Sequence, residues 1–202
     1  MESWSRTGGE ILPDRMRRST PPTITQAALE KAALHYLERF AASTEQLRKV
    51  LLRRIERAVR LGAEPEAVAA ARRDVEPLLK RYLAAGFLDD RRFAEAQAQS
   101  LLRRGTSRRG IRLRLAAKGI ERELVEAALA EDAEVASELA AAGALARRRR
   151  LGPYRAAGAR AAFRQKDLAT LARAGFPLEI ARQVLAAGDP EALERIIAGE
   201  GA

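Results

Sequence analysis

The spacing of apolar side chains predicts a chain that is helical almost throughout, because these side chains recur every three or four residues. Stretches with this spacing end close to glycines, which close the last turn of a helix. Ser43 with Gln46 forms a capping-box start, and Asp189 followed by Pro190 predicts a short C-terminal helix. Before that helix we predict nine others, at residues 25–40, 44–60, 66–85, 90–104, 107–117, 121–130, 132–150, 158–173 and 177–187.

Two segments of the chain resemble each other. The segment "LAAKGIERELVEAAL" at residues 115–129 aligns without a gap with "LARAGFPLEIARQVL", which starts 56 residues later. The apolar positions Leu124, Val125, Ala128 and Leu129 fall on Ile180, Ala181, Val184 and Leu185, as one apolar face of a helix requires. Gly119 falls on Gly175, each just past a helix end. The alignment indicates a repeated module of three helices.

These patterns predict an all-α fold made of three tandem three-helix repeats. Their expected bounds are residues 24–86, 87–130 and 131–187, between a flexible N-terminal tail at 1–23 and a C-terminal tail with a short helix at 188–202. The composition supports the fold class, because Ala, Leu, Arg and Glu are good helix formers and dominate the sequence. Aromatic residues are only 4% of the chain, which leaves few large side chains for a thick core.

Several kinds of site are excluded by composition. The chain has no cysteine, so it has neither disulfides nor thiolate metal sites. His35 is the only histidine, which excludes a multi-histidine metal centre, and we expect it to be exposed. No apolar run reaches the roughly 18 residues of a membrane span, and the start lacks the apolar core of a signal peptide. We therefore expect a cytoplasmic protein without a cofactor or metal.

The formal charge of +10 predicts a polyanionic partner, either nucleic acid, an acidic protein or both. A generally basic proteome or a solubility effect is the alternative, but clustering of the cations argues against it. The predicted basic face comprises Lys49, Arg53, Arg57 and Arg60; then Arg103, Arg104, Arg108, Arg109, Arg112, Arg114 and Lys118; and finally Arg147, Arg148, Arg149, Arg150, Arg164 and Lys166. Arg155 and Arg160 add to the last group, and no acidic residue lies between Glu138 and Asp167.

The stretch from Gly86 to Leu129 admits three interpretations. Asp89 and Asp90 with Glu95 could hold magnesium in a nuclease, but adjacent acids before a helix more simply cap its N-terminus. The helix pair around residues 107–130 resembles a helix-turn-helix, yet its second helix is acidic where a recognition helix would meet phosphate. We therefore favour a scaffold that presents cations over a catalytic site or a sequence-specific DNA reader.

Four segments resemble the RecX family of regulators of the RecA recombinase. They are "ALHYLERFAASTEQLRKVLLRR" at residues 33–54, "GFLDDRRFAEA" at 86–96, "RGTSRRGIRLRLAAKGI" at 104–120 and "LARAGFPLEIARQVL" at 171–185. The resemblance assigns a structural motif to Asp89, Asp90, Arg92, Phe93, Ala94, Ile111, Leu115, Gly119, Ile120 and Gly175, and it places Arg108 and Arg109 on the exposed basic face. The chain departs from the family pattern at "IERAVRLGAEPEAVAAARRDVE" and near "PYRAAGARAAF".

The resemblance implies an elongated, curved molecule without catalytic activity. Members of the family bind in the groove of the RecA filament on single-stranded DNA and restrain strand exchange, ATP hydrolysis and coprotease action. Expected partners are therefore the RecA nucleoprotein filament and DNA, single-stranded or double-stranded, without sequence preference and with no membrane. We expect a monomer that modulates DNA repair, recombination and the SOS response.

The alternative is a general DNA-binding helical module with no role at RecA. The scarcity of aromatic residues argues against recognition by base stacking. The alternative predicts equal affinity for bare DNA and for the RecA–DNA filament.

Overall fold

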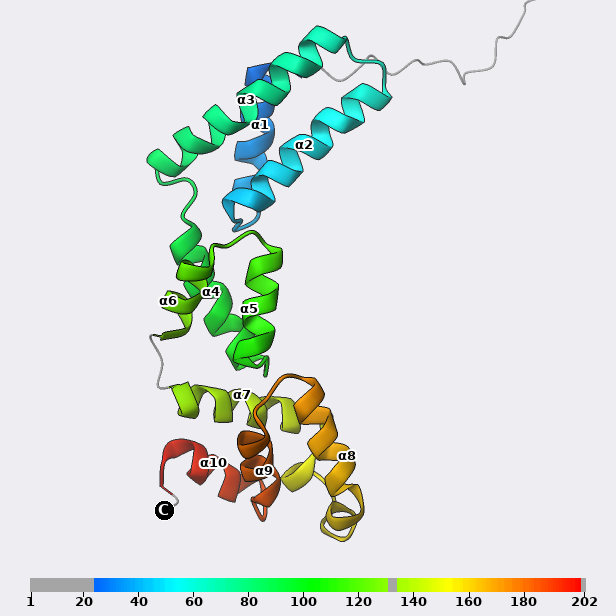
Figure 1. The fold of residues 1–202 in the computed structure, drawn as a ribbon, viewed down its shortest axis with the longest axis vertical. Helices are drawn as coiled ribbons and strands as arrows, with labels where there is room; N and C mark the ends of the chain where they lie inside the picture. The colour runs from blue at the N-terminus through cyan, green and yellow to red at the C-terminus, as the bar shows by residue number, and fades with distance from the viewer. Residues whose placement is uncertain (1–23, 131–133, 201–202) are drawn as a thin grey trace, which may run out of the picture.

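The computed structural model describes residues 24–130 and 134–200, and of residues 134–136 only the backbone. Every regular element in these ranges is a helix, arranged in an elongated molecule (Figure 1). The α-helices are α1 (Gln26–Leu37), α2 (Thr44–Arg60), α3 (Pro65–Ala84), α4 (Asp90–Arg103), α5 (Arg108–Ala117), α6 (Arg122–Ala130), α7 (Glu134–Arg149), α8 (Arg160–Arg173), α9 (Leu178–Ala186) and α10 (Pro190–Ala198). The prediction of an all-α fold is confirmed.

The helix starts follow the capping residues in the sequence. Ser43 forms the predicted capping box with Gln46 at the start of α2. The side chain of Asp89 accepts from the backbone N–H of Arg92 at 2.9 Å, and Ser107 caps α5 in the same way. Each cap satisfies N–H groups that have no partner inside the helix. The predicted role of the acidic pair as a helix start is therefore confirmed.

Helices α1, α2 and α3 pack around their own apolar core. Its fully buried centre is formed by Leu29, Leu47, Leu51, Ile55 and Leu79. An ion pair from Arg48 on α2 to Glu76 on α3, at 2.6 Å, joins the two longer helices on the outside. The segment at which the chain departs from the family pattern forms the end of α2, a turn and the first half of α3. Its residues lengthen this helical hairpin.

Helices α4 to α10 share a second apolar core, which extends from Phe93 to Leu193. The predicted boundary at residues 130–131 therefore does not separate two cores, and the division into three repeats stays a prediction. The structure describes the predicted C-terminal tail with a short helix, residues 188–202, as far as residue 200. The predicted short helix forms, capped by Asp189, but Leu193 on it is fully buried against the core. Burial of this side chain holds α10 against α7, where Gly143 leaves room for it.

The segment near "PYRAAGARAAF" forms two short 3-10 helices, η2 (Gly152–Tyr154) and η3 (Ala157–Ala159). The next α-helix consequently begins at Arg160, two residues after its predicted start. The predicted tail at residues 1–23 lies outside the described residues. None of the helices in the described ranges combines the length and the apolar character of a membrane-spanning segment.

Helices α2, α5 and α8 follow one another end to end along one side of the molecule (Figure 1). At the first junction, the Ser43 hydroxyl at the start of α2 donates to the carbonyl of Lys118 at the end of α5, at 2.6 Å. At the second, the Ser107 hydroxyl at the start of α5 donates to the carbonyl of Ala174 at the end of α8, at 2.7 Å. We call these three helices the column.

A carboxylate reinforces each junction of the column in the same way. Asp90 at the start of α4 accepts from the backbone N–H of Thr44 at 2.8 Å. Glu138 on α7 accepts from the backbone N–H of Arg108 at 3.0 Å. In both cases an acid from a helix outside the column, α4 or α7, binds the first N–H of a column helix, where negative charge is favoured. The two junctions thus use equivalent donors and acceptors.

Glycines bring the column helices close together at these junctions. Gly119 and Gly175, which the sequence aligns with each other, have φ angles of +75° and +90°. A Cβ on Gly119 would lie 2.3 Å from the Cβ of Glu45, and one on Gly175 would lie 2.8 Å from the Ser107 hydroxyl. Both positions therefore require glycine for conformation and for space. The aligned apolar positions are buried as predicted, except that Leu124 is half-buried.

Candidate functional site

The cations of α2 lie on its exposed surface, as the sequence predicts. Lys49, Arg53, Arg57 and Arg60 are all exposed. Lys49 lies 3.4 Å from Glu45, and the Nε of Arg53 donates to the backbone carbonyl of Lys49. Among the described residues, no carboxylate lies within 4.0 Å of the guanidinium groups of Arg53, Arg57 and Arg60. Three guanidinium groups thus remain available to an outside anion.

The expectation that Arg108 belongs to the exposed basic face is wrong. Its side chain is 7% exposed, and its guanidinium donates to the carbonyl of Leu129 and, at 3.3 Å, to the hydroxyl of Ser137. Arg108 is the first residue of α5, where its side chain turns inward against the ends of α6 and α7. It therefore joins three helices rather than presenting charge to a partner.

The remaining cations of α5 differ in the contacts that their side chains make. Arg109 and Arg114 are exposed, and Arg114 donates to the Thr106 hydroxyl at 2.8 Å. Lys118 is half-buried, with its ammonium 5.2 Å from the ring centre of Phe93. Arg112 makes two hydrogen bonds of 2.9 Å to Glu126 on α6. This pairing lowers the pKa of Glu126. It also occupies two of the guanidinium N–H donors of Arg112, which are then not offered to a partner.

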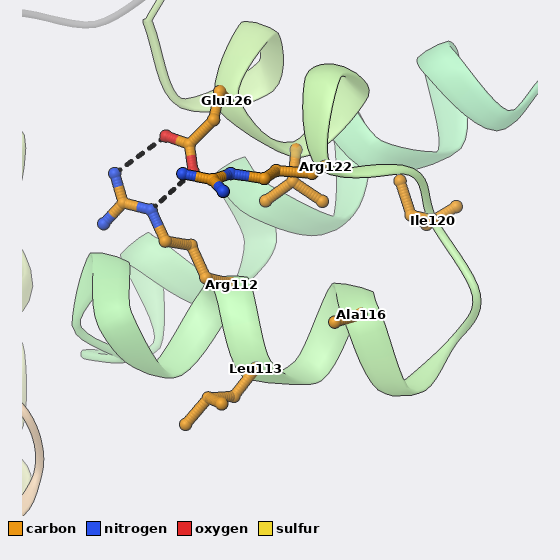
Figure 2. Close-up of a pocket in the computed structure, with 7 residues that line it drawn as sticks. Arg112, Leu113, Ala116, Ile120, Arg122 and Glu126 are labelled. Carbon is orange, nitrogen blue, oxygen red and sulfur yellow. Dashed lines mark hydrogen bonds and ion pairs between the residues drawn. The ribbon is translucent and has the colours of Figure 1, made fainter.

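A groove of about 700 Å³ lies between α5 and α6. Its lining comprises Arg112, Leu113, Ala116, Ile120, Arg122, Val125 and Glu126. Figure 2 shows Arg112 and Arg122 on either side of the Glu126 carboxylate, with Ala116 and Ile120 farther along. Leu113 is 66% exposed, although it is a large apolar residue on a basic helix. The groove offers apolar contact next to guanidinium groups, a combination suited to a protein surface.

The end of α7 and the start of α8 carry the densest positive charge. Arg147, Arg148, Arg149 and Arg150 are exposed, and Arg148 donates to the carbonyl of Arg104 at 2.6 Å, next to the equally exposed Arg103. Arg164 and Lys166 on α8 are exposed as well. The described residues place no carboxylate within 4.0 Å of any of these side chains.

Two arginines of this region have structural roles instead. Arg155 binds the carboxylate of Asp167 through two hydrogen bonds of 2.7 Å. Burial opposes ionisation of Asp167, but the bonds from Arg155 and from the Gly152 N–H outweigh it and hold its pKa below the ordinary value. Arg160 donates to the carbonyls of Pro153, Arg155 and Gly188. Together, Arg155 and Arg160 fix the segment before α8 and link it to the loop after α9.

The apolar residues that the resemblance assigns to a structural motif lie inside the molecule. Phe93, Ala94, Ile111, Leu115 and Ile120 are buried. Arg92 is exposed and lies 3.4 Å from Asp89. The three carboxylates weighed as magnesium ligands have separate partners, since Asp89 caps α4, Asp90 binds Thr44 and Glu95 pairs with Arg91 at 3.0 Å. Within the described residues, no group of three or more His, Asp or Glu side chains is arranged to hold a metal ion.

His35 is exposed as predicted, 3.8 Å from Glu38 on the same helix. The sequence interpretation missed the hydrogen bonds at the two junctions of the column, which use Ser43, Ser107, Asp90 and Glu138. The only signal of these hydrogen bonds in the sequence is a serine at the start of α2 and of α5, and each serine also serves as an ordinary helix cap. Contacts across such distances along the chain carry no local pattern.

Comparison with known proteins assigns the family. A family model described as "RecX, second three-helix domain" matches residues 89–129. The Regulatory protein RecX of Myxococcus xanthus (strain DK1622) is 42% identical over 168 residues, which is 82% of this chain and 88% of that protein. The chain belongs to the RecX family. The Regulatory protein RecX of Agrobacterium fabrum (strain C58 / ATCC 33970) is 39% identical over 105 residues, 52% of this chain and 55% of that protein. No solved structure matches the chain.

The family assignment confirms the resemblance found in the sequence. The curated RecX relatives bear the name of regulatory proteins, and the match to the second domain falls within the predicted second repeat. The features to be explained are thus those of a RecX-family regulator: a helical column, exposed cations along it, and a groove beside its middle helix.

Proposed function

We propose that this protein binds the RecA filament assembled on single-stranded DNA and restrains its strand exchange, ATP hydrolysis and coprotease action. In this proposal it acts as a cytoplasmic monomer, without catalysis of its own, and so modulates recombination, DNA repair and the SOS response. The observation that carries the proposal is the column, because helices far apart in the sequence join end to end and each carries exposed cations.

Exposed cations on three joined helices suit a polyanion that presents repeated negative groups. A filament presents the same acidic groups and phosphates repeatedly along its groove, so a stiff row of cations can engage several of them together. Each exposed ion pair contributes only about 0.2–1 kcal/mol. Arginine is well suited because its planar guanidinium binds carboxylates and phosphates through two hydrogen bonds. Useful affinity therefore depends on the junctions that align α2, α5 and α8.

Contacts with both protein and DNA fit the mixed character of the surface. The groove at α5 and α6, with the exposed Leu113, offers apolar contact that a phosphate backbone does not use. In the stretch between Glu138 and Asp167, the four arginines at 147–150 and also Arg164 and Lys166 have no carboxylate within 4.0 Å among the described residues. These two surfaces support a partner that contains protein and nucleic acid together.

The direct test is the ATPase activity of RecA on single-stranded DNA. Adding this protein should suppress ATP hydrolysis at substoichiometric or modest ratios, and the suppression should weaken as salt is raised because the contacts are largely ionic. Unchanged hydrolysis over a wide range of ratios at low salt would contradict the proposal.

A general DNA-binding module without a role at RecA is the second candidate. The dense positive charge around α7 and α8 favours it, since such charge binds any nucleic acid. Affinity for bare single-stranded DNA equal to affinity for the RecA–DNA filament would support this candidate. Markedly tighter binding to the filament supports the RecA proposal.

A further inference from the structure

Phe163 on α8 differs from the other exposed aromatic residues of the described chain. Its side chain is 38% exposed, with the Arg155 guanidinium 4.4 Å and the Lys166 ammonium 5.7 Å from its ring centre. Phe40 and Phe87 are also exposed, but each packs against a tyrosine. Aromatic residues are too scarce for a row of stacked bases, but one exposed ring among cations is an arrangement with which proteins hold single-stranded nucleic acid.

The ring of Phe163 is held by a preformed support. Asp167 is 1% exposed and accepts from both the Arg155 guanidinium and the Gly152 N–H. This fixes the guanidinium, which in turn contacts the ring through a cation–π interaction. A base that stacks on the exposed part of the ring would therefore meet a surface that needs little ordering.

The charge around this ring is suited to a phosphate backbone. Lys166 is exposed next to the ring, and Arg164, which follows Phe163 in the chain, is exposed and donates to the carbonyl of Leu185 at 3.5 Å. No acidic residue occurs in the sequence between Glu138 and Asp167. Asp167 itself is buried and engaged by Arg155. Only some cations of α2 and α5 have acids close by, since Lys49 pairs with Glu45 and Arg112 with Glu126.

We propose that Phe163, Arg164 and Lys166 form a contact site for single-stranded DNA, in which a base stacks on the Phe163 ring while the two cations bind flanking phosphates. The site rests on the proposed function and assigns the α8 end of the column to the DNA strand. It contacts any base, because every base offers an aromatic face. Duplex DNA keeps its bases stacked inside and cannot use the ring.

The test compares bare strands that differ only in their bases. Fluorescence anisotropy would measure binding of the protein to a fluorescein-labelled thymidine oligonucleotide, to an abasic strand of equal length and to a duplex. Phe163→Ala should weaken binding to the thymidine strand roughly 5- to 150-fold, the range that removal of one stacked base implies. It should leave binding to the abasic strand and to the duplex unchanged, while Phe163→Trp should keep the affinity of the natural protein.

Phe87→Ala is the matched control, because Phe87 is 59% exposed but lies between α3 and α4, away from this site. It should leave binding to all three probes unchanged. Equal weakening on the thymidine and abasic strands, or no weakening at all, would overturn the stacking role.

The two cations are tested through the salt dependence of binding to single strands. Changing Arg164 and Lys166 to Gln should reduce the slope of the logarithm of affinity against the logarithm of salt concentration. The expected reduction is about 0.7 for each phosphate that the variant no longer neutralises. An unchanged slope would overturn their role.

RecA ATPase measurements separate this site from the proposed function. If the natural protein suppresses hydrolysis but Phe163→Ala binds bare strands normally, the stacking site is wrong and the RecA role stands. If binding to bare strands depends on Phe163 but hydrolysis is never suppressed, the stacking site stands and the RecA role fails.

Discussion

At the scale of single residues, a few polar side chains near helix ends decide how the column helices meet. Ser43 and Ser107 each perform two tasks, since the hydroxyl caps its own helix and donates to the carbonyl of the next column helix. Asp90 and Glu138 add a carboxylate to the same two places. Removing one such serine hydroxyl removes a cap and a link together.

Ser107→Ala should therefore cost about 1–2 kcal/mol in free energy of unfolding, the usual value for losing a helix cap together with a buried hydrogen bond. Urea unfolding followed by circular dichroism measures it. Ser100→Ala is the matched control, because Ser100 lies on α4 and its hydroxyl caps no helix. Equal stability of the two variants would show that the junction contributes nothing.

Gly119→Ala should destabilise the protein more than Gly62→Ala. Both glycines have positive φ angles, +75° and +82°, so alanine is strained at either position. A Cβ at Gly62 has no atom within 4 Å, whereas one at Gly119 would overlap Glu45. The difference between the variants, expected to be about 1–3 kcal/mol, isolates the close approach of α2 and α5. Thermal or urea unfolding gives the comparison, and identical destabilisation would contradict a tight junction.

At the scale of helices, most bounds could be predicted from the sequence, because caps, glycines and apolar spacing are local signals. The start of α8 could not be predicted, since η2 and η3 precede it and Arg160 is held by the carbonyls of Pro153 and Arg155 in the preceding segment and of Gly188 after α9. The inward turn of Arg108 was missed for the same reason: its partners at Leu129 and Ser137 belong to other helices. The periodic spacing of apolar residues shows on which face of a helix a residue lies, but it does not show which other helix packs against that face.

The ion pair between Arg155 and Asp167 should make stability depend on pH. The pKa of Asp167 is lowered in the folded protein, so its contribution is present above the ordinary carboxyl pKa of about 3.9 and is lost as pH falls through the lowered value. Asp167→Asn should cost roughly 3 kcal/mol near pH 7, and the gap from the natural protein should narrow at the acid end. Urea unfolding across pH measures it; a gap that widens in acid would contradict this assignment.

At the scale of the whole molecule, the column explains how helices far apart in the sequence can act as one surface. Most residues of the basic face predicted from the sequence are exposed in the structure, yet Arg108 is buried and Arg112 is bound to Glu126. The periodicity of the sequence identifies candidate cations for a binding surface. Residues distant in the sequence decide which of these cations are bound within the protein and which can bind a partner. A strongly positive chain can also bind polyanions anywhere on its surface, so the position of the charge matters more than its amount.

Co-sedimentation with RecA filaments on single-stranded DNA tests this central claim most directly. One variant changes one exposed arginine on each column helix to Glu, at Arg57, Arg109 and Arg164. Its control changes three exposed arginines on α3, α9 and α10, at Arg72, Arg182 and Arg195, and alters the net charge equally. We predict that the column variant stays in the supernatant while the control sediments like the natural protein; equal weakening in both variants, or none in either, would contradict a binding surface along the column.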